Sequence, residues 1–181
     1  MKLMIASDIH GSAHYCRLML DAFSKEHADR LVLLGDILYH GPRNDLPLEY
    51  APKQVITMLN EHKDKLLCVR GNCDTEVDQM VLQFPVLSDS MLLWTQTHTI
   101  FATHGHVFNL SNLPPLCEGD VLLHGHTHVP AFEQANGITY INPGSVSIPK
   151  ESSLHSYIIL EDDTVTFKDL ESGTPYRVCQ L

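Results

Sequence analysis

The sequence has little positive charge: 12 lysines and arginines stand against 22 aspartates and glutamates, which gives a formal net charge of −10. This balance argues against a stable nucleic-acid partner or a membrane-surface partner, because both present anionic surfaces that need a basic face. A small anionic substrate is still compatible, since a bound metal ion can reverse the field locally. The sequence also lacks an apolar run of transmembrane length, and residues 3–6 are too short a run for a signal peptide.

Cysteines are few and show no disulfide or zinc-ribbon pattern. There are five of them, an odd number, and no two are spaced as CxxC. We therefore expect reduced thiols and a cytoplasmic protein. The length of 181 residues and the absence of a linker predict a single domain over residues 1–181.

Histidine, by contrast, is abundant. The chain contains 12, and five of them fall within 25 residues: His104, His106, His124, His126 and His128. A protein surface does not need such clustering, whereas metal sites and proton-transfer sites use it.

Five short apolar runs are each followed at once by glycine with aspartate, asparagine or histidine. They cover residues 3–6, 31–34, 66–69, 100–102 and 121–123. Runs of this kind predict buried strands, and apolar spacing predicts helices over residues 16–23 and 52–59. Strands that alternate with helices pair in parallel, so we expect the five polar clusters to meet at one sheet edge.

The second half of the chain has a different pattern. Residues 129–133, 138–141, 157–160 and 164–167 predict short strands, and hairpin turns are expected at Asn136-Gly137 and Asp162-Asp163. We expect these strands to form a second, largely antiparallel sheet that packs on the first. An edge or a face of this sheet is a candidate surface for self-association, so the oligomeric state stays open.

The residues that follow the apolar runs are of the types that bind divalent first-row metals. Each cluster alone is more often a turn or a helix cap, but seven plausible ligands after successive strands favour a metal site. They are Asp8, His10, Asp36, Asn72, His104, His126 and His128.

The motifs D-x-H, G-D, G-N-C-D, H-G-H and G-H-x-H occur in this order between Asp8 and His128. This pattern resembles the calcineurin-like metallophosphoesterase superfamily. The compact size and Cys73 in the third motif are most similar to its small bacterial YfcE-type phosphodiesterases. The resemblance implies an α/β (α+β) fold, a four-layer sandwich of two mixed β-sheets flanked by α-helices.

The same resemblance implies a dinuclear centre bridged by Asp36. One ion would be held by Asp8, His10, Asp36 and His128, and the other by Asp36, Asn72, His104 and His126. This oxygen and nitrogen ligand set favours Mn²⁺, with Mg²⁺, Fe or Zn²⁺ as alternatives. The expected reaction is hydrolysis of a small-molecule phosphodiester by in-line attack of a metal-bridging hydroxide.

The identity of the general acid is open. Many members of the superfamily have histidine, oriented by the next acidic residue, where this chain has Cys73 and Asp74. The resemblance therefore places Cys73 and Asp74 among the expected catalytic residues. A thiol is a poorer acid partner than imidazole near neutrality, so we expect good leaving groups or an acid from elsewhere, such as His106. Arg43, in a long loop, is a candidate for a bidentate phosphate clamp. Structural roles for His106 and Arg43 are equally compatible with the sequence.

Two other functions stay open. One is a phosphomonoesterase that acts on a nucleotide or a phosphoprotein. The other is a non-catalytic scaffold like the retromer subunit that shares this fold, although such a scaffold would be expected to have lost ligands.

Overall fold

The structure, a computed structural model, describes all residues from 1 to 181. Its first third alternates strands and helices: β1 (Lys2–Ala6), α1 (Ala13–Glu26), β2 (Arg30–Leu33), α2 (Pro52–Glu61), the 3₁₀ turn η1 (Lys63–Lys65) and β3 (Leu66–Cys68). As predicted, β1, β2 and β3 pair in parallel. Because helices connect them, the polar segments after these strands emerge at the same sheet edge.

Both predicted helices are confirmed, and local chemistry sets their ends. The Ser12 hydroxyl caps α1 by accepting a hydrogen bond from the backbone N–H of Tyr15 (3.2 Å). Pro52 lies in the first turn of α2, where its missing N–H costs nothing. The buried face of α1 has the predicted spacing and includes Cys16, Met19, Leu20 and Phe23.

A second sheet contains five strands in the order β4-β5-β6-β8-β7. Its strands are β4 (Ser90–Trp94), β5 (Thr99–Thr103), β6 (Val121–Leu123), β7 (Ala131–Ala135) and β8 (Ile138–Asn142). The hairpin turn at Asn136-Gly137 is confirmed, with both residues in the left-handed region (φ 54° and 77°).

The prediction that the strands of the second half form a sheet of their own is wrong. Strands β7 and β8 join β6, whereas β9 (Ser156–Glu161), β10 (Thr164–Asp169) and β11 (Pro175–Gln180) extend the first sheet, in the order β11-β10-β9-β1-β2-β3. Strand β9 pairs antiparallel with β1. Its apolar residues are buried on both faces, as a central strand requires: Tyr157 and Ile159 face the helices, and Ile158 and Leu160 face the other sheet.

The sequence did not predict β4, β11 or the short helix α3 (Glu76–Val81). Strands β4 and β11 are edge strands, and most residues of β11 are exposed. Helix α3 contributes no buried residue at all. Elements that bury so little have no hydrophobic period to detect.

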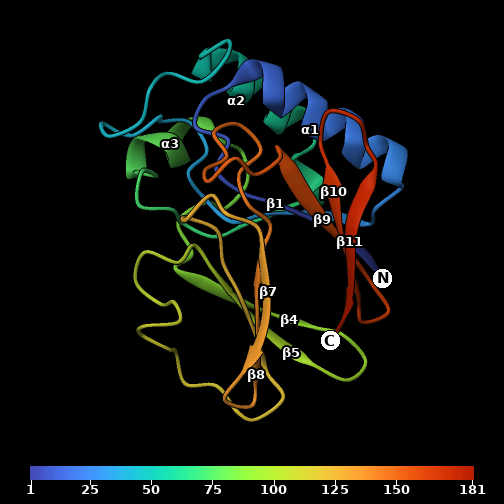
Figure 1. Cartoon of the computed structure of the whole chain (residues 1–181). Helices are drawn as coiled ribbons and strands as arrows, with labels where there is room; N and C mark the ends of the chain where they lie inside the picture. The colour runs from blue at the N-terminus through green and yellow to red at the C-terminus, as the bar shows by residue number, and fades with distance from the viewer.

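The layers stack around two hydrophobic cores (Figure 1). One core lies between the helices and the six-stranded sheet, and the other lies between the two sheets. The sandwich of two mixed sheets is thereby confirmed, with its α-helices above the six-stranded sheet. A loop, and not a helix, covers part of the outer face of the five-stranded sheet. There Phe108 packs edge-on against Phe101, with ring centroids 5.9 Å apart. None of the helices has the length and apolar character needed to cross a membrane.

Candidate metal centre

The seven predicted ligands converge, and they do so from both sheets. Asp8 and His10 follow β1, Asp36 follows β2 and Asn72 follows β3, whereas His104 follows β5 and His126 and His128 follow β6. The expectation of a single sheet edge is therefore corrected. The segments that follow strands of both packed sheets converge, and the site lies where they meet.

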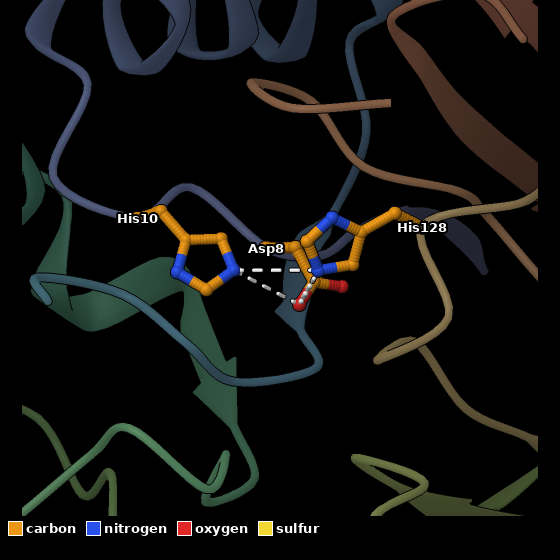
Figure 2. A group of neighbouring side chains, drawn as sticks. All are labelled: Asp8, His10 and His128. Carbon is orange, nitrogen blue, oxygen red and sulfur yellow. Dashed lines mark hydrogen bonds and ion pairs between the residues drawn. The ribbon is translucent and has the colours of Figure 1, made fainter. Parts of the chain in front are cut away.

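Asp8, His10 and His128 form one group (Figure 2). The His128 Nε2 lies 3.2 Å from the Asp8 Oδ1 and 3.4 Å from the His10 Nε2, and the His10 Nε2 lies 3.5 Å from the same Asp8 oxygen. That oxygen is buried and accepts no hydrogen bond. A buried carboxylate oxygen without a donor, faced by two imidazole nitrogens, fits a metal ligand set.

His104, Asn72 and His126 form a second group. The His104 Nε2 lies 3.1 Å from the Asn72 Oδ1 and 3.1 Å from the His126 Nδ1. The Asp36 Oδ2 lies 3.5 Å from the His104 Nε2 and 3.6 Å from the His10 Nε2, so one carboxylate oxygen stands between the two groups. The other oxygen, Oδ1, accepts a hydrogen bond from the Cys73 N–H (2.8 Å).

Backbone carbonyls orient three of the imidazoles. The Nδ1 atoms of His10, His104 and His128 lie 2.8, 2.6 and 2.8 Å from the carbonyl oxygens of Tyr39, Leu34 and Ile148. A carbonyl can only accept, so Nδ1 carries a proton in each ring, and Nε2 is the nitrogen that faces the site and can bind a metal ion once it is unprotonated. Such outer contacts fix the tautomer that a metal-binding histidine needs.

The backbone of the site is unusual. Five of the seven converging residues have positive φ: Asp8 (60°), His10 (50°), Asp36 (55°), His126 (66°) and His128 (63°). Non-glycine residues rarely adopt this conformation, and it clusters at functional sites. Space is also restricted, because a Cβ on Gly71 would lie 2.1 Å from the Asp36 Oδ1, so only glycine fits there.

The titratable groups of the site perturb one another strongly. Burial alone would raise the pKa of Asp8, but contacts with His10 and His128 hold it well below its usual value. Burial would lower the pKa of His104, but the Asp36 and Asp8 carboxylates outweigh burial and raise it to about 9. For His126, burial and the positive charge of His104 lower the pKa to about 4. Without a metal ion, the protonated His104 therefore supplies the positive charge that stabilises the carboxylates of Asp36 and Asp8.

The Asp74 side chain points towards the backbone and not into the cavity where a catalytic residue is expected. Its buried carboxylate accepts hydrogen bonds from the backbone N–H groups of Asp36 (2.8 Å), Ile37 (2.9 Å) and Gly71 (2.7 Å). It does not line the cavity over the site. The carboxylate therefore holds the two segments that carry Asp36 and Asn72 against each other.

A cavity of about 420 Å³ opens over the converging residues, and Cys73 and Arg43 both line it. Burial and the nearby Asp36 carboxylate raise the pKa of the Cys73 thiol, so it stays protonated near neutrality. His106 is exposed and does not line this cavity, although its ring centroid lies 6.3 Å from that of His126. Burial and the neighbouring His104 lower its pKa.

Three residues that position the site, Asn142, Ser145 and Ser147, had little signal in the sequence. The Asn142 Nδ2 donates to the Gly125 carbonyl (2.8 Å), which steadies the turn that carries His126 and His128. The hydroxyls of Ser145 and Ser147 both donate to the Asp8 carbonyl (2.9 Å each). The contacts of Asn142 with Gly125 and of Ser145 with Asp8 show that the segment Asn142-Pro143-Gly144-Ser145 supports the site. Lys150, which also lines the cavity, was not predicted.

Known proteins with the same architecture place the site in context. Phosphodiesterase YfcE of Escherichia coli K12 is 50% identical over 166 residues, which cover 92% of this chain and 90% of YfcE. A solved structure of E. coli YfcE, described as a phosphoesterase, has a TM-score of 0.96 at 47% identity and covers 99% of both chains.

More distant matches occur in both sequence and structure. The probable metallophosphoesterase YsnB of Bacillus subtilis is 27% identical over 93% of this chain and 89% of its own. A structure of Vps29 from Entamoeba histolytica complexed with zinc has a TM-score of 0.61 at 17% identity, covers 99% of each chain and shows the fold alone.

The family is decided by the extent of the match. Residues 1–164 match the model of the calcineurin-like phosphoesterase superfamily domain. This region includes every strand that carries a candidate ligand, so the motifs, the geometry and the comparison agree. The chain belongs to the calcineurin-like phosphoesterase superfamily.

Proposed function

We propose that the protein is a metal-dependent phosphodiesterase that hydrolyses small phosphodiesters. The observation that carries the proposal is the position of the Asp36 Oδ2, 3.6 Å from the His10 Nε2 and 3.5 Å from the His104 Nε2. A shared carboxylate oxygen is what two closely spaced cations require, because their repulsion needs an anion between them.

In this proposal each group of residues holds one divalent ion. Asp8, His10 and His128 complete one ligand set and Asn72, His104 and His126 complete the other, with Asp36 in common. Mn²⁺ suits these ligands because none of the seven is a thiolate.

All five cysteines are unpaired, in keeping with a cytoplasmic protein. Edge strands β7 and β11 leave self-association open, which sedimentation measures directly.

When bound, the two ions supply a hydroxide nucleophile at neutral pH and neutralise charge on the phosphoryl oxygens. The remaining work falls to this chain's own residues. Asn72 adds an oxygen ligand without charge, so the site keeps a net positive charge for an anionic substrate. Arg43 lines the cavity from the loop between β2 and α2, where its guanidinium can bind a phosphate through two parallel hydrogen bonds. Asp74 acts as a positioning residue through its three backbone contacts.

Proton donation to the leaving group is the weak part of the site. The raised pKa keeps the Cys73 thiol neutral and a poor acid, and the lowered pKa of His106 leaves that imidazole mostly unprotonated near pH 7. Cys73 lies closer to the reaction because it lines the cavity. Both candidates therefore favour diesters whose leaving groups need little protonation, such as aryl esters.

The test is hydrolysis of bis(p-nitrophenyl) phosphate beside p-nitrophenyl phosphate, with chelator-treated protein before and after addition of Mn²⁺. We expect metal-dependent cleavage that favours the diester. Asn72→Ala, which removes an oxygen ligand, is expected to lower the rate at least about 100-fold. Gln134→Ala, which removes an exposed amide on β7, is the matched control. Preference for the monoester would support a phosphomonoesterase, and two bound ions without turnover of either ester would support a scaffold.

Metal loading should release protons. Without a metal ion, the pKa of His104 is about 9, so this imidazole is mostly protonated at pH 7.5 and must lose its proton to become a ligand. Affinity for Mn²⁺ should therefore rise with pH towards 9 and weaken as pH falls. We expect release of at least one proton per chain at pH 7.5, since His104 loses its proton and formation of the hydroxide adds to the total, measured by calorimetry in buffers of different ionisation enthalpy.

The control for proton release is a histidine elsewhere. His14→Gln, on α1, should leave the release unchanged, whereas His104→Gln should lower it by about one proton per chain. Binding of Mn²⁺ to the unmodified protein at pH 7.5 without proton release would show that His104 is neutral beforehand and would contradict the prediction.

A further inference from the structure

The cavity over the candidate metal centre has a basic side chain on each of two walls. Arg43 belongs to a loop beside Cys73, since a Cβ on Gly41 would lie 3.3 Å from the Cys73 Sγ. Lys150 belongs to the loop between β8 and β9, beside His128, because its backbone N–H donates to the His128 carbonyl (3.2 Å). The two cations thus reach the cavity from different loops, one on the Cys73 side and one on the His128 side.

The backbone of Lys150 is held in place. Its carbonyl accepts hydrogen bonds from the N–H (3.0 Å) and the hydroxyl (2.6 Å) of Ser153. The same loop supplies the Ile148 carbonyl that orients His128. The position of Lys150 is therefore tied to that of a candidate metal ligand.

The Lys150 ammonium has no partner within the protein. It forms no hydrogen bond or ion pair, although acidic residues outnumber basic ones by 22 to 12 and Glu151 is its neighbour. Elsewhere basic side chains do pair, as Lys2 and Lys168 do with Glu26. An unpaired cation at a cavity wall is available to an anionic ligand.

The cavity has no phenylalanine, tyrosine or tryptophan on which a nucleobase could stack. Of its twelve lining residues, Cys73 is the only one counted as hydrophobic. Proteins that select a base use aromatic side chains for this purpose. Selectivity here must come from charge and hydrogen bonding instead.

The charge of the centre identifies the matching group. Two divalent ions and the carboxylates of Asp8 and Asp36 leave two positive charges, which one hydroxide and one phosphodiester anion neutralise. Arg43 and Lys150 are then in excess. On the basis of the proposed phosphodiesterase function, we propose that Lys150 binds a second anionic group, a phosphate or a carboxylate, that the diester substrate carries beside its scissile phosphate.

The test compares two substrates that differ in one phosphate group: thymidine 5′-(p-nitrophenyl phosphate) and its 3′-phosphorylated form. We expect kcat/KM to be higher for the 3′-phosphorylated form. Lys150→Met should reduce the ratio of the two kcat/KM values about tenfold, through a higher KM for the 3′-phosphorylated form. Lys150→Arg should restore most of it, because the charge returns. Lys25→Met, on the last turn of α1, is the control for loss of one positive charge.

Binding of the products gives a readout that does not need turnover. Calorimetry should show that thymidine 3′,5′-bisphosphate binds the Mn²⁺-loaded protein more tightly than thymidine 5′-phosphate, and that Lys150→Met removes most of the difference. An equal effect of Lys150→Met on both products, or none on either, would overturn the proposal. Failure of the unmodified protein to cleave either substrate would contradict the proposed function, and the product-binding comparison would still decide the role of Lys150.

Discussion

Asp36→Asn is expected to lower kcat/KM for an aryl phosphodiester by about 10³-fold, which corresponds to about 4 kcal/mol of transition-state stabilisation. The substitution keeps the shape of the side chain and an oxygen that can accept from the Cys73 N–H, so the fold should survive. It removes the negative charge that stands between the two groups of imidazoles. We expect fewer than two Mn²⁺ ions per chain by elemental analysis, together with the loss of activity.

The control for Asp36→Asn is Asp45→Asn, an exposed aspartate in the loop before α2. It loses the same charge outside the cavity lining and should retain both ions and the full rate. If Asp36→Asn bound two ions and kept its rate, the bridging position of this carboxylate would have no chemical role.

Asp74→Ala is expected to lower the free energy of unfolding by about 3 kcal/mol or more. It leaves three buried backbone N–H groups without acceptors, and each such group costs about 1–3 kcal/mol. Urea denaturation in the presence of a chelator measures the loss without a contribution from metal binding.

Asp74→Asn is the matched variant, because it keeps one acceptor oxygen and should lose less stability than Asp74→Ala. Asp45→Ala again controls for an exposed aspartate. A loss below about 0.5 kcal/mol in Asp74→Ala would show that water replaces the carboxylate, since surface substitutions have effects of that size. The positioning role would then be wrong.

The candidate ligands were predictable because each follows a buried strand, and strand ends are where parallel sheets collect polar groups. The division of the strands between two sheets was not. An apolar run such as residues 157–160 says that a strand is buried, but not which neighbour covers it. Pairing of β9 with β1 is decided by contacts between residues about 150 positions apart, as for Leu3 and Leu160.

Asp74 and Lys150 show two further limits of sequence reasoning. Asp74 was placed in catalysis because it adjoins Cys73, yet neighbouring residues in this turn face different ways: the thiol faces the cavity and the carboxylate faces the backbone. Lys150 is an exposed lysine in a loop, with no periodic signal. Only the folded chain, which brings its N–H to the His128 carbonyl, places it at the cavity.

The left-handed backbone at Asp8, His10, Asp36, His126 and His128 bears on how this centre could be redesigned. A non-glycine residue in that region costs about 1–3 kcal/mol, and glycine relieves most of this strain. Glycine at Asp8 or Asp36 would also remove a carboxylate that accepts a hydrogen bond from the backbone N–H of His126 or Cys73, so the strain is offset in part by contacts of the same side chains. Any redesign of the centre that exchanges these residues therefore changes backbone strain and buried hydrogen bonding together, and the two effects on fold stability have opposite signs.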